Sequence, residues 1–324
     1  MRLVFRADAS RKIGSGHVMR IATIAQEAIS RGIECHFVGR ISDLEWVSAY
    51  IQNLGFASIV SEEDSWIANC LEDVLVLDSY TTSLDSQYSN PRNWKLLVCI
   101  ADGFTPDYPA DIKIKQSLVR SVQESASNSF DGPDYILIRK GIGKSRRGKP
   151  ESSSTQILIL GGGSDPFGFV HAALTEISLI QGDFKIIVFS NEDLSEFKFL
   201  DIEQHQIGPE LDGLAGEVDL VFTTASTTSF EFIAREIPTL IACVVDNQEK
   251  TYAELSHLKF ALPIGMRSNE GTWCFDQKII RSAVTNPDVR EDLKSRILNV
   301  IDLRGPSRVV DEIQYLLSKG EVRR

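Results

Sequence analysis

The sequence predicts an α/β protein built from two doubly wound domains, and three observations support this fold class. Short apolar runs alternate with amphipathic stretches in the first half of the chain, a pattern typical of parallel sheets covered by helices. The same alternation starts again after residue 155. The length of 324 residues also suits about two domains.

The first half contains the clearest strand signals. Its Val-, Leu- and Ile-rich runs are nearly continuous, as expected for strands buried on both faces of a parallel sheet. We expect strands at residues 3–6, 34–38, 58–60, 74–77 and 96–100, and helices over residues 20–31 and 43–54. Ligands of such sheets bind outside the carboxyl ends of the strands. The loops that carry Asp8, Asp78 and Asp102 follow three of these strands and are predicted to share one rim.

A change in composition marks the predicted domain boundary. Residues 141–155 are Gly- and Ser-rich, include the basic run from Lys144 to Arg147 and lack periodicity, which is typical of a linker. We therefore assign residues 1–140 and 156–324 to the two domains. In the second domain we expect strands at 156–160, 184–189, 219–222 and 238–245, helices over 167–180 and 229–235, and helical structure from about 276 to the end.

Composition and charge exclude several classes of function. The net charge of −11 argues against a broad basic surface for nucleic acid or anionic lipid. No apolar run approaches the ~18 residues of a membrane span, and residues 1–6 are too short for a secretory signal. The five cysteines are scattered and odd in number, so neither a disulfide framework nor a zinc site is indicated. We expect a soluble, cytoplasmic protein.

The segment Gly14-Ser15-Gly16-His17 joins the first predicted strand to the first predicted helix. Glycine lets the backbone turn tightly and approach a ligand closely, and a helix start offers N–H groups to an anion. Histidine exchanges a proton near neutral pH. The alternative is that Gly14 and Gly16 only shape a turn and His17 caps the helix.

Other chemical motifs are missing from the sequence. The remaining histidines, His36, His171, His205 and His257, fit structural or solvated positions better than catalytic ones. The sequence has no H-E-x-x-H motif or histidine pair at metal spacing, so we expect no metal. It also lacks the P-loop, G-x-G-x-x-G and G-x-S-x-G patterns, and no cofactor is implied. His17 remains as the candidate for general acid–base chemistry.

The second domain offers a candidate anion site. Four hydroxyl residues, 226–229, stand where a helix is predicted to start; they can cap the helix or hold a diphosphate with their N–H groups. The glycines after the strand at 156–160 either approach a ligand or form a plain turn. Glu231 would accept hydrogen bonds from ribose hydroxyls, or it would serve only the helix dipole. The candidate nucleotide-binding residues are Gly162, Gly163, Ser226, Thr227, Thr228 and Glu231.

Several of these segments together resemble a known family. Arg6-Ala7-Asp8-Ala9-Ser10 and Ile13-Gly14-Ser15-Gly16-His17-Val18-Met19-Arg20 are similar to the N-terminal signature of the UDP-2,4-diacetamido-2,4,6-trideoxy-β-L-altropyranose hydrolases of pseudaminic acid biosynthesis, with their spore-coat-polysaccharide-type relatives. The similarity continues through Asp78-Ser79-Tyr80, residues 132–139, residues 162–165, residues 227–231, Pro238 and Asn247-Gln248. The family usually has a glycine near Ser226 and two successive aspartates at Ala101-Asp102.

The resemblance implies a glycosyltransferase-B type fold, with two Rossmann-like domains facing across a cleft. It implies that water displaces UDP from a UDP-sugar with inversion at the anomeric carbon, that the histidine matching His17 is the base, and that no metal takes part. The candidate substrate-binding residues are Asp8, Gly14, Gly16, Arg20, Tyr80, Asn247 and Gln248. Alternatively, Asp8 is a turn residue, Tyr80 a rim aromatic, and the Asn-Gln pair the start of a helix.

Two other functions fit the same residues. A glycosyltransferase of this fold would move the sugar from UDP to an acceptor, since a base near the anomeric carbon serves either reaction. The N-terminal half has no evident apolar patch for a membrane-bound acceptor, which favours hydrolysis. The third candidate is a catalytically silent nucleotide-sugar-binding protein, against which the intact His17 argues.

Overall fold

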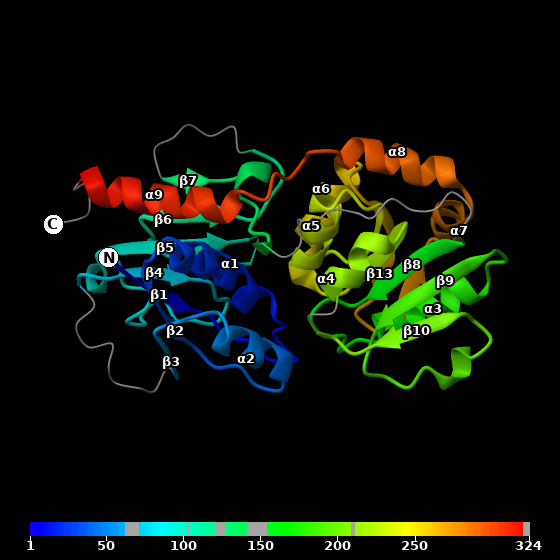
Figure 1. Cartoon of the computed structure of the whole chain (residues 1–324), viewed down its shortest axis with the longest axis horizontal. Helices are drawn as coiled ribbons and strands as arrows, with labels where there is room; N and C mark the ends of the chain where they lie inside the picture. Colours follow the sequence, from blue (N-terminus) through cyan, green and yellow to red (C-terminus); the bar gives the residue numbers. More distant parts are fainter. Residues whose placement is uncertain (62–70, 103, 121–127, 141–153, 209–210, 320–324) are drawn as a thin grey trace. The chain divides into compact units, whose positions relative to one another are not determined.

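The chain forms two compact units in the computed structural model, which describes residues 1–61, 71–102, 104–120, 128–140, 154–208 and 211–319 (Figure 1). Unit 1 comprises Met1–Lys140 and Asp302–Arg324, and unit 2 comprises Gly141–Ile301. Most of the predicted linker, including the Lys144–Arg147 run, lies outside the described residues.

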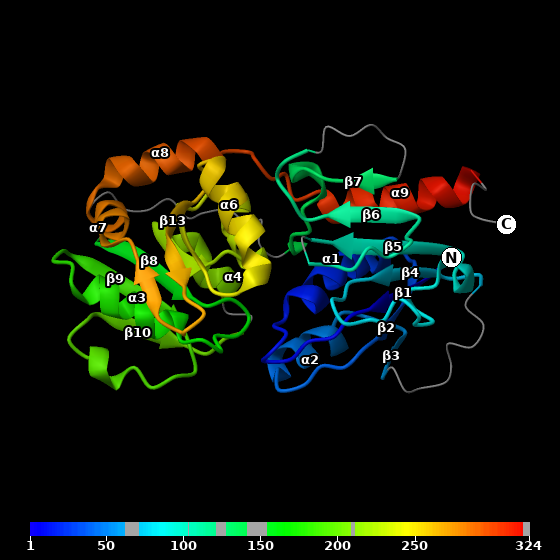
Figure 2. The ribbon, with the colours of Figure 1, turned by 180° about the vertical axis from the view of Figure 1, so that it is seen from behind.

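Unit 1 contains a seven-stranded parallel sheet with strand order β3-β2-β1-β4-β5-β6-β7, which can be followed in Figure 2. Its strands are β1 (Arg2–Arg6), β2 (Glu34–Val38), β3 (Ser58–Val60), β4 (Val74–Leu77), β5 (Leu96–Ala101), β6 (Ile112–Lys115) and β7 (Ser129–Phe130). The first five match the predicted strands to within one residue at each end. Strands β6 and β7 were not predicted, because both are short and neither contains a continuous apolar run.

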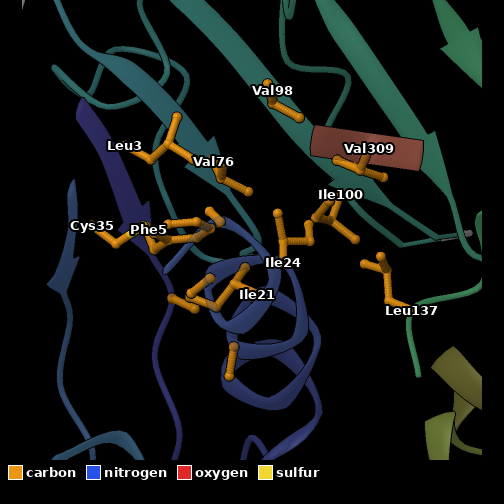
Figure 3. Packing of buried hydrophobic residues seen from close by; sticks show 14 of the residues in the cluster. Leu3, Phe5, Ile21, Ile24, Cys35, Val76, Val98, Ile100, Leu137 and Val309 are labelled. Carbon is orange, nitrogen blue, oxygen red and sulfur yellow. The ribbon is translucent and has the colours of Figure 1, made fainter. Parts of the chain in front are cut away.

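One face of this sheet is covered by helices α1 (Gly16–Ser30), α2 (Glu45–Gln52) and α9 (Gly305–Lys319). Ile21 and Ile24 of α1 lie beside strand residues such as Phe5 and Ile100 (Figure 3), and all four are fully buried. Each such side chain stabilises the fold by about 1.5–3 kcal/mol. Tyr88, Trp94 and Tyr108 pack with strand residues in a second cluster, so apolar clusters lie on both faces of the sheet.

Helix α9 belongs to unit 1, and the expectation that residues 302–324 form part of the second domain is wrong. Arg31, at the end of α1, donates hydrogen bonds to Asp311 and Ser307. A Cβ on Gly305 would come within 2.1 Å of the carbonyl oxygen of Ile136, so α9 begins in close contact with the end of the first segment. These contacts are long-range, which is why helix periodicity alone could not assign the helix to a unit.

Unit 2 repeats the architecture, with strand order β10-β9-β8-β11-β12-β13-β14 and all strands parallel except β14. Its strands are β8 (Thr155–Leu160), β9 (Phe184–Phe189), β10 (Ile202–His205), β11 (Leu220–Thr224), β12 (Thr239–Cys243), β13 (Leu262–Arg267) and β14 (Trp273–Phe275). The predicted strands correspond to β8, β9, β11 and β12. Strands β10, β13 and β14, on the flanks of the sheet, were missed.

The helices of unit 2 are α3 (Phe169–Ser178), α4 (Leu211–Leu214), α5 (Thr227–Ala234), α6 (Glu249–His257), α7 (Gln277–Thr285) and α8 (Pro287–Ile297). Residues of α3 and α7 join one apolar cluster with the sheet, and α5 contributes Phe232 to another. The predicted fold class, two parallel α/β units, is therefore confirmed.

Candidate active site

The carboxyl-end rim of unit 1 carries the loops after β1, β4 and β5. These strands are neighbours in the sheet and run parallel, so the prediction that the three loops share a rim is confirmed. Helix α1 starts at the same rim, after a turn in which Gly14 has φ +85° and its N–H donates to the carbonyl of Ser10 at 2.7 Å. This left-handed conformation explains a glycine at position 14.

His17 and Asp78 form a buried pair at this rim. The distance between His17 Nδ1 and Asp78 Oδ1 is 2.6 Å, and the two residues are 5% and 0% exposed. Asp78 also accepts hydrogen bonds from a guanidinium, as a carboxylate does, so Nδ1 carries the proton and donates it. Nε2 is then the basic nitrogen of the ring, and no described residue hydrogen-bonds to it. The side chain of His17 therefore does not cap α1.

Arg20 lies one helical turn after His17 and binds the same carboxylate. Its Nε donates to Asp78 Oδ2 at 2.7 Å and its Nη2 to Asp78 Oδ1 at 2.8 Å, while Nη1 donates to Asp102 Oδ2 at 3.1 Å. Burial disfavours the charged guanidinium, but Asp78 and Asp102 outweigh burial and raise the pKa of Arg20. Every guanidinium nitrogen therefore contacts a carboxylate of the protein.

Tyr80 and Asp102 complete what we call the His17 cluster: His17, Arg20, Asp78, Tyr80 and Asp102. The Tyr80 hydroxyl donates to Asp102, and its ring meets the imidazole of His17 edge-on, with centroids 4.2 Å apart. Burial would raise the pKa of Asp102, but Arg20 and the Tyr80 hydroxyl lower it below its usual value. Burial, opposed by Arg20 and assisted by Asp102, raises the pKa of Tyr80, which keeps the phenol a donor.

Tyr108 anchors the loop that carries Tyr80. The Tyr108 hydroxyl donates to the carbonyls of Thr82 at 2.9 Å and of Ser79 at 3.2 Å. Burial raises the pKa of Tyr108 to about 12, so the hydroxyl keeps its proton at neutral pH. The backbone on either side of Tyr80 is thus held in place by hydrogen bonds from the fully buried Tyr108.

Asp8, expected near the substrate, forms a separate ion pair. Its carboxylate accepts a hydrogen bond from Arg6 Nη2 at 2.8 Å and from the backbone N–H of Arg40 at 2.8 Å. A Cβ on Gly39 would come within 1.8 Å of the Ala7 carbonyl oxygen, so the two loops are tightly apposed. Asp8 therefore fastens the loop after β1 to the loop after β2.

In unit 2 the loops after β8 and β11 meet around Gly162. A Cβ on Gly162 would lie 3.7 Å from Ser226 Oγ, 3.8 Å from Thr228 Oγ1 and 4.0 Å from Thr224 Oγ1, and its φ is +99°. We call these three hydroxyl residues the hydroxyl cluster. Only Thr224, the last residue of β11, was absent from the prediction. Its position at a strand end was the available signal.

Helix α5 starts two residues earlier than predicted, at Thr227, with Ser226 as its N-cap residue. The Ser226 side chain makes no capping hydrogen bond and instead accepts one from Thr224 Oγ1 at 3.1 Å. Because of the earlier start, Glu231 falls beyond the first turn, and the dipole explanation for it is wrong. The first N–H groups of α5 face the same end of the sheet as the hydroxyls.

The remaining predicted residues of unit 2 have varied positions. Gln248 accepts a hydrogen bond from the backbone N–H of Val244 at 3.0 Å, so its amide oxygen closes the turn after β12. Asn247, partly buried, sits beside it in a short 3₁₀ turn. Gly163 lies in the loop after β8, whose Asp165 accepts hydrogen bonds from the first N–H groups of α3.

Within the described ranges, no group of three or more His, Cys, Asp or Glu side chains is arranged to hold a metal ion. In the same part of the chain, no helix has both the length and the apolar character that crossing a membrane requires.

Comparisons with known proteins identify the fold. No protein-family model matches the chain. An uncharacterized protein of Methanocaldococcus jannaschii, MJ1062, is 24% identical over 283 residues, which cover 78% of this chain and 57% of that protein. The chain therefore spans little more than half the length of this relative.

Solved structures match almost the whole chain. The glycosyltransferase of kitacinnamycin has a TM-score of 0.66 at 14% identity, and the match covers 97% of this chain and 98% of that chain. A putative UDP-N-acetylglucosamine 2-epimerase of Listeria monocytogenes has a TM-score of 0.64 at 12% identity, with 98% of this chain and 97% of that chain covered. A structure of S. aureus MnaA with UDP has a TM-score of 0.62 at 9% identity, with 98% and 96% covered. These similarities confirm the predicted glycosyltransferase-B type fold.

Proposed function

We propose that this protein hydrolyses a UDP-activated amino- or deoxy-sugar to the free sugar and UDP, in the synthesis of a pseudaminic-acid-type surface glycan. The observation that carries the proposal is the His17–Asp78 pair, 2.6 Å apart and buried. A carboxylate on Nδ1 fixes the ring tautomer and leaves Nε2 as an oriented base. The motif resemblance around His17, and the fold shared with enzymes whose names include nucleotide sugars, support the substrate class.

The proposed reaction is a single displacement. His17 Nε2 takes a proton from water while the water oxygen bonds to the anomeric carbon. The bond from that carbon to the diphosphate oxygen breaks, and its electron pair leaves with UDP. Asp78 stabilises the imidazolium that forms. In unit 2, the hydroxyl cluster and the first N–H groups of α5 would bind a diphosphate and stabilise its charge.

Substrate turnover in labelled water tests the proposal. The purified full chain is incubated with a panel of UDP-sugars in H₂¹⁸O without acceptor, and UDP and free sugar are analysed by mass spectrometry and NMR. We expect ¹⁸O in the sugar and not in UDP, with the inverted anomer formed first. His17→Asn should abolish release.

The matched control is His36→Asn, because His36 is another buried histidine, hydrogen-bonded to Ser58 and Glu34, outside the His17 cluster. Label in UDP would indicate attack at phosphorus and refute the proposal. Release that requires an added acceptor would establish a glycosyltransferase instead. Release that survives His17→Asn would remove His17 from the chemistry.

A further inference from the structure

We infer that Arg20 is a positioning residue that holds Asp78 against His17 Nδ1, and that it does not bind the substrate. The catalytic role that this inference gives to Arg20 rests on the proposed function. The inference also makes a structural claim about the His17 tautomer that can be tested without any substrate.

The contacts of the guanidinium carry the inference. Arg20 grips Asp78 with two parallel hydrogen bonds, Nε to Oδ2 at 2.7 Å and Nη2 to Oδ1 at 2.8 Å. This geometry fixes the plane of the carboxylate as well as its position. Asp78 Oδ1 is the atom that accepts from His17, so the orientation of Arg20 determines where the acceptor for Nδ1 stands.

The position of Arg20 argues against substrate binding. The residue is 6% exposed, and its third nitrogen, Nη1, donates to Asp102. To move out to a phosphate or a sugar, the guanidinium would have to leave the fully buried carboxylate of Asp78 and the partly buried carboxylate of Asp102. Breaking a buried ion pair leaves an uncompensated buried charge, which costs more than a new hydrogen bond to a charged group returns.

The short contact between Arg20 Nη2 and His17 Nδ1, 3.0 Å, gives Arg20 a second effect. Both nitrogens are donors once Nδ1 is protonated, so this contact is not a hydrogen bond. The guanidinium therefore lies in contact with both members of the His17–Asp78 pair. Through Asp102, the same guanidinium also fixes the Tyr80 hydroxyl, whose ring lies against His17.

Arg20→Lys tests the inference because lysine keeps the charge but cannot form the paired hydrogen bonds. Its control is Arg31→Lys, since Arg31 lies at the other end of α1 and also binds two carboxylates, Glu27 and Asp311. Long-range ¹H–¹⁵N spectra of histidine-labelled protein report the tautomer of each ring, and His17→Asn assigns the His17 signals. Steady-state kinetics on the UDP-sugar give kcat and KM separately.

We expect a single Nδ1–H tautomer for His17 in the wild type and in Arg31→Lys, and a mixture of tautomers in Arg20→Lys. With a substrate in hand, we expect kcat of Arg20→Lys to fall about 10- to 100-fold while KM changes less than about twofold. A raised KM with unchanged kcat and an unchanged tautomer would identify Arg20 as a substrate ligand and overturn the inference. An unchanged tautomer alone would also overturn it.

Asp102→Asn covers the case in which Arg20→Lys does not fold. This variant weakens the bond at Nη1 and leaves the paired bonds to Asp78, so His17 should keep its single Nδ1–H tautomer. A mixture of tautomers in Asp102→Asn would show that the paired bonds to Asp78 do not fix the ring, and would overturn the inference. If no UDP-sugar is hydrolysed at all, the proposed function fails, whereas the tautomer measurements still decide the role of Arg20.

Discussion

Units 1 and 2 share one strand order but carry opposite chemistry at their carboxyl-end rims. The rim of unit 1 holds ionisable side chains in the His17 cluster, where each charge has a partner. The rim of unit 2 holds neutral hydroxyls and a left-handed glycine at the start of α5. A network of buried ion pairs suits proton transfer, because it fixes donors and acceptors in place. A neutral set of hydroxyl and N–H groups suits an anionic ligand, which brings its own charge.

The largest effect is expected from Asp78→Asn, which tests the role of unit 1. The amide would present the wrong partner to His17 Nδ1, and kcat should fall by on the order of 10⁴-fold, as when a supporting aspartate selects the histidine tautomer in other enzymes. The control is Asp73→Asn: Asp73 precedes β4 as Asp78 follows it, and it is also buried in an ion pair, with Arg2. We expect Asp73→Asn to lower the melting temperature without changing kcat. Equal losses of kcat in both variants would show a merely structural role for Asp78.

Sequence patterns correctly predicted the central strands of each sheet and the loops that follow them. Continuous apolar runs in the sequence indicate the buried strands β1, β4 and β5. Because His17, Asp78 and Asp102 lie in the segments that follow these strands, they are expected on one rim. The edge strand β10 is mostly polar and the edge strand β14 is only three residues long, so neither gives a long apolar run. Local patterns therefore identified which residues gather at the rim.

Pairing within the rim could not be predicted from the sequence. Arg20 was expected to face the substrate, and Asp8 to position water or sugar, because both lie in the most distinctive motifs. Which carboxylate each arginine meets depends on side-chain direction across three separate loops. Arg20 reaches Asp78, 58 residues away, whereas Arg6 pairs with Asp8, two residues away. The same limit applies to α9, whose helical pattern carries no information about its partner.

The units also differ in the number of chain segments that form them, and Gly305→Ala tests this difference. Unit 1 is completed by α9 from the end of the chain, while unit 2 is one continuous segment. The added methyl would overlap the Ile136 carbonyl oxygen at 2.1 Å, which should destabilise unit 1 by about 3 kcal/mol. Hydrogen exchange should show lost protection in β1 and β4 and unchanged protection in β8 and β11.

The control for this prediction is Gly213→Ala in α4 of unit 2, where a Cβ would have no neighbour within 4 Å. There alanine should be neutral or slightly stabilising, because it restricts the unfolded chain. A uniform loss of protection over both units in Gly305→Ala would contradict the division into separately stabilised units.

Gly162→Ala and Gly168→Ala test the anion site of unit 2. Both glycines have positive φ, so both substitutions should cost on the order of 1 kcal/mol in stability. Only the methyl at position 162 enters the space among the hydroxyls of Ser226 and Thr228; at Gly168 no atom lies within 4 Å. Isothermal titration calorimetry with UDP should show about tenfold weaker binding for Gly162→Ala and unchanged binding for Gly168→Ala. Equal affinity in both variants would place the diphosphate elsewhere.

The smallest effect concerns two carboxylates whose pKa values should move in opposite directions. In unit 1, Arg20 lowers the pKa of Asp102 against the effect of burial. In unit 2, burial raises the pKa of Asp165, because its partners are only the neutral N–H groups of α3 and its loop. Asp102 should therefore stabilise the fold above its ordinary pKa and lose that contribution as the pH falls. For Asp165 the folded state binds the proton more tightly, so its contribution is present at low pH and is lost as the pH rises through its raised pKa.

Carboxyl ¹³C NMR titration of the folded protein, with Asp102→Asn and Asp165→Asn for assignment, measures both shifts directly. The difference in the free energy of unfolding between the wild type and Asp102→Asn should approach zero as the pH falls through the lowered pKa of Asp102. If both carboxyls titrate on the same side of the ordinary value, the contrast between an ionic rim and a neutral rim is wrong. If the pKa of Asp102 moves back toward its ordinary value in Arg20→Lys, the ionic character of the unit 1 rim comes from the Arg20 guanidinium, which binds both Asp78 and Asp102.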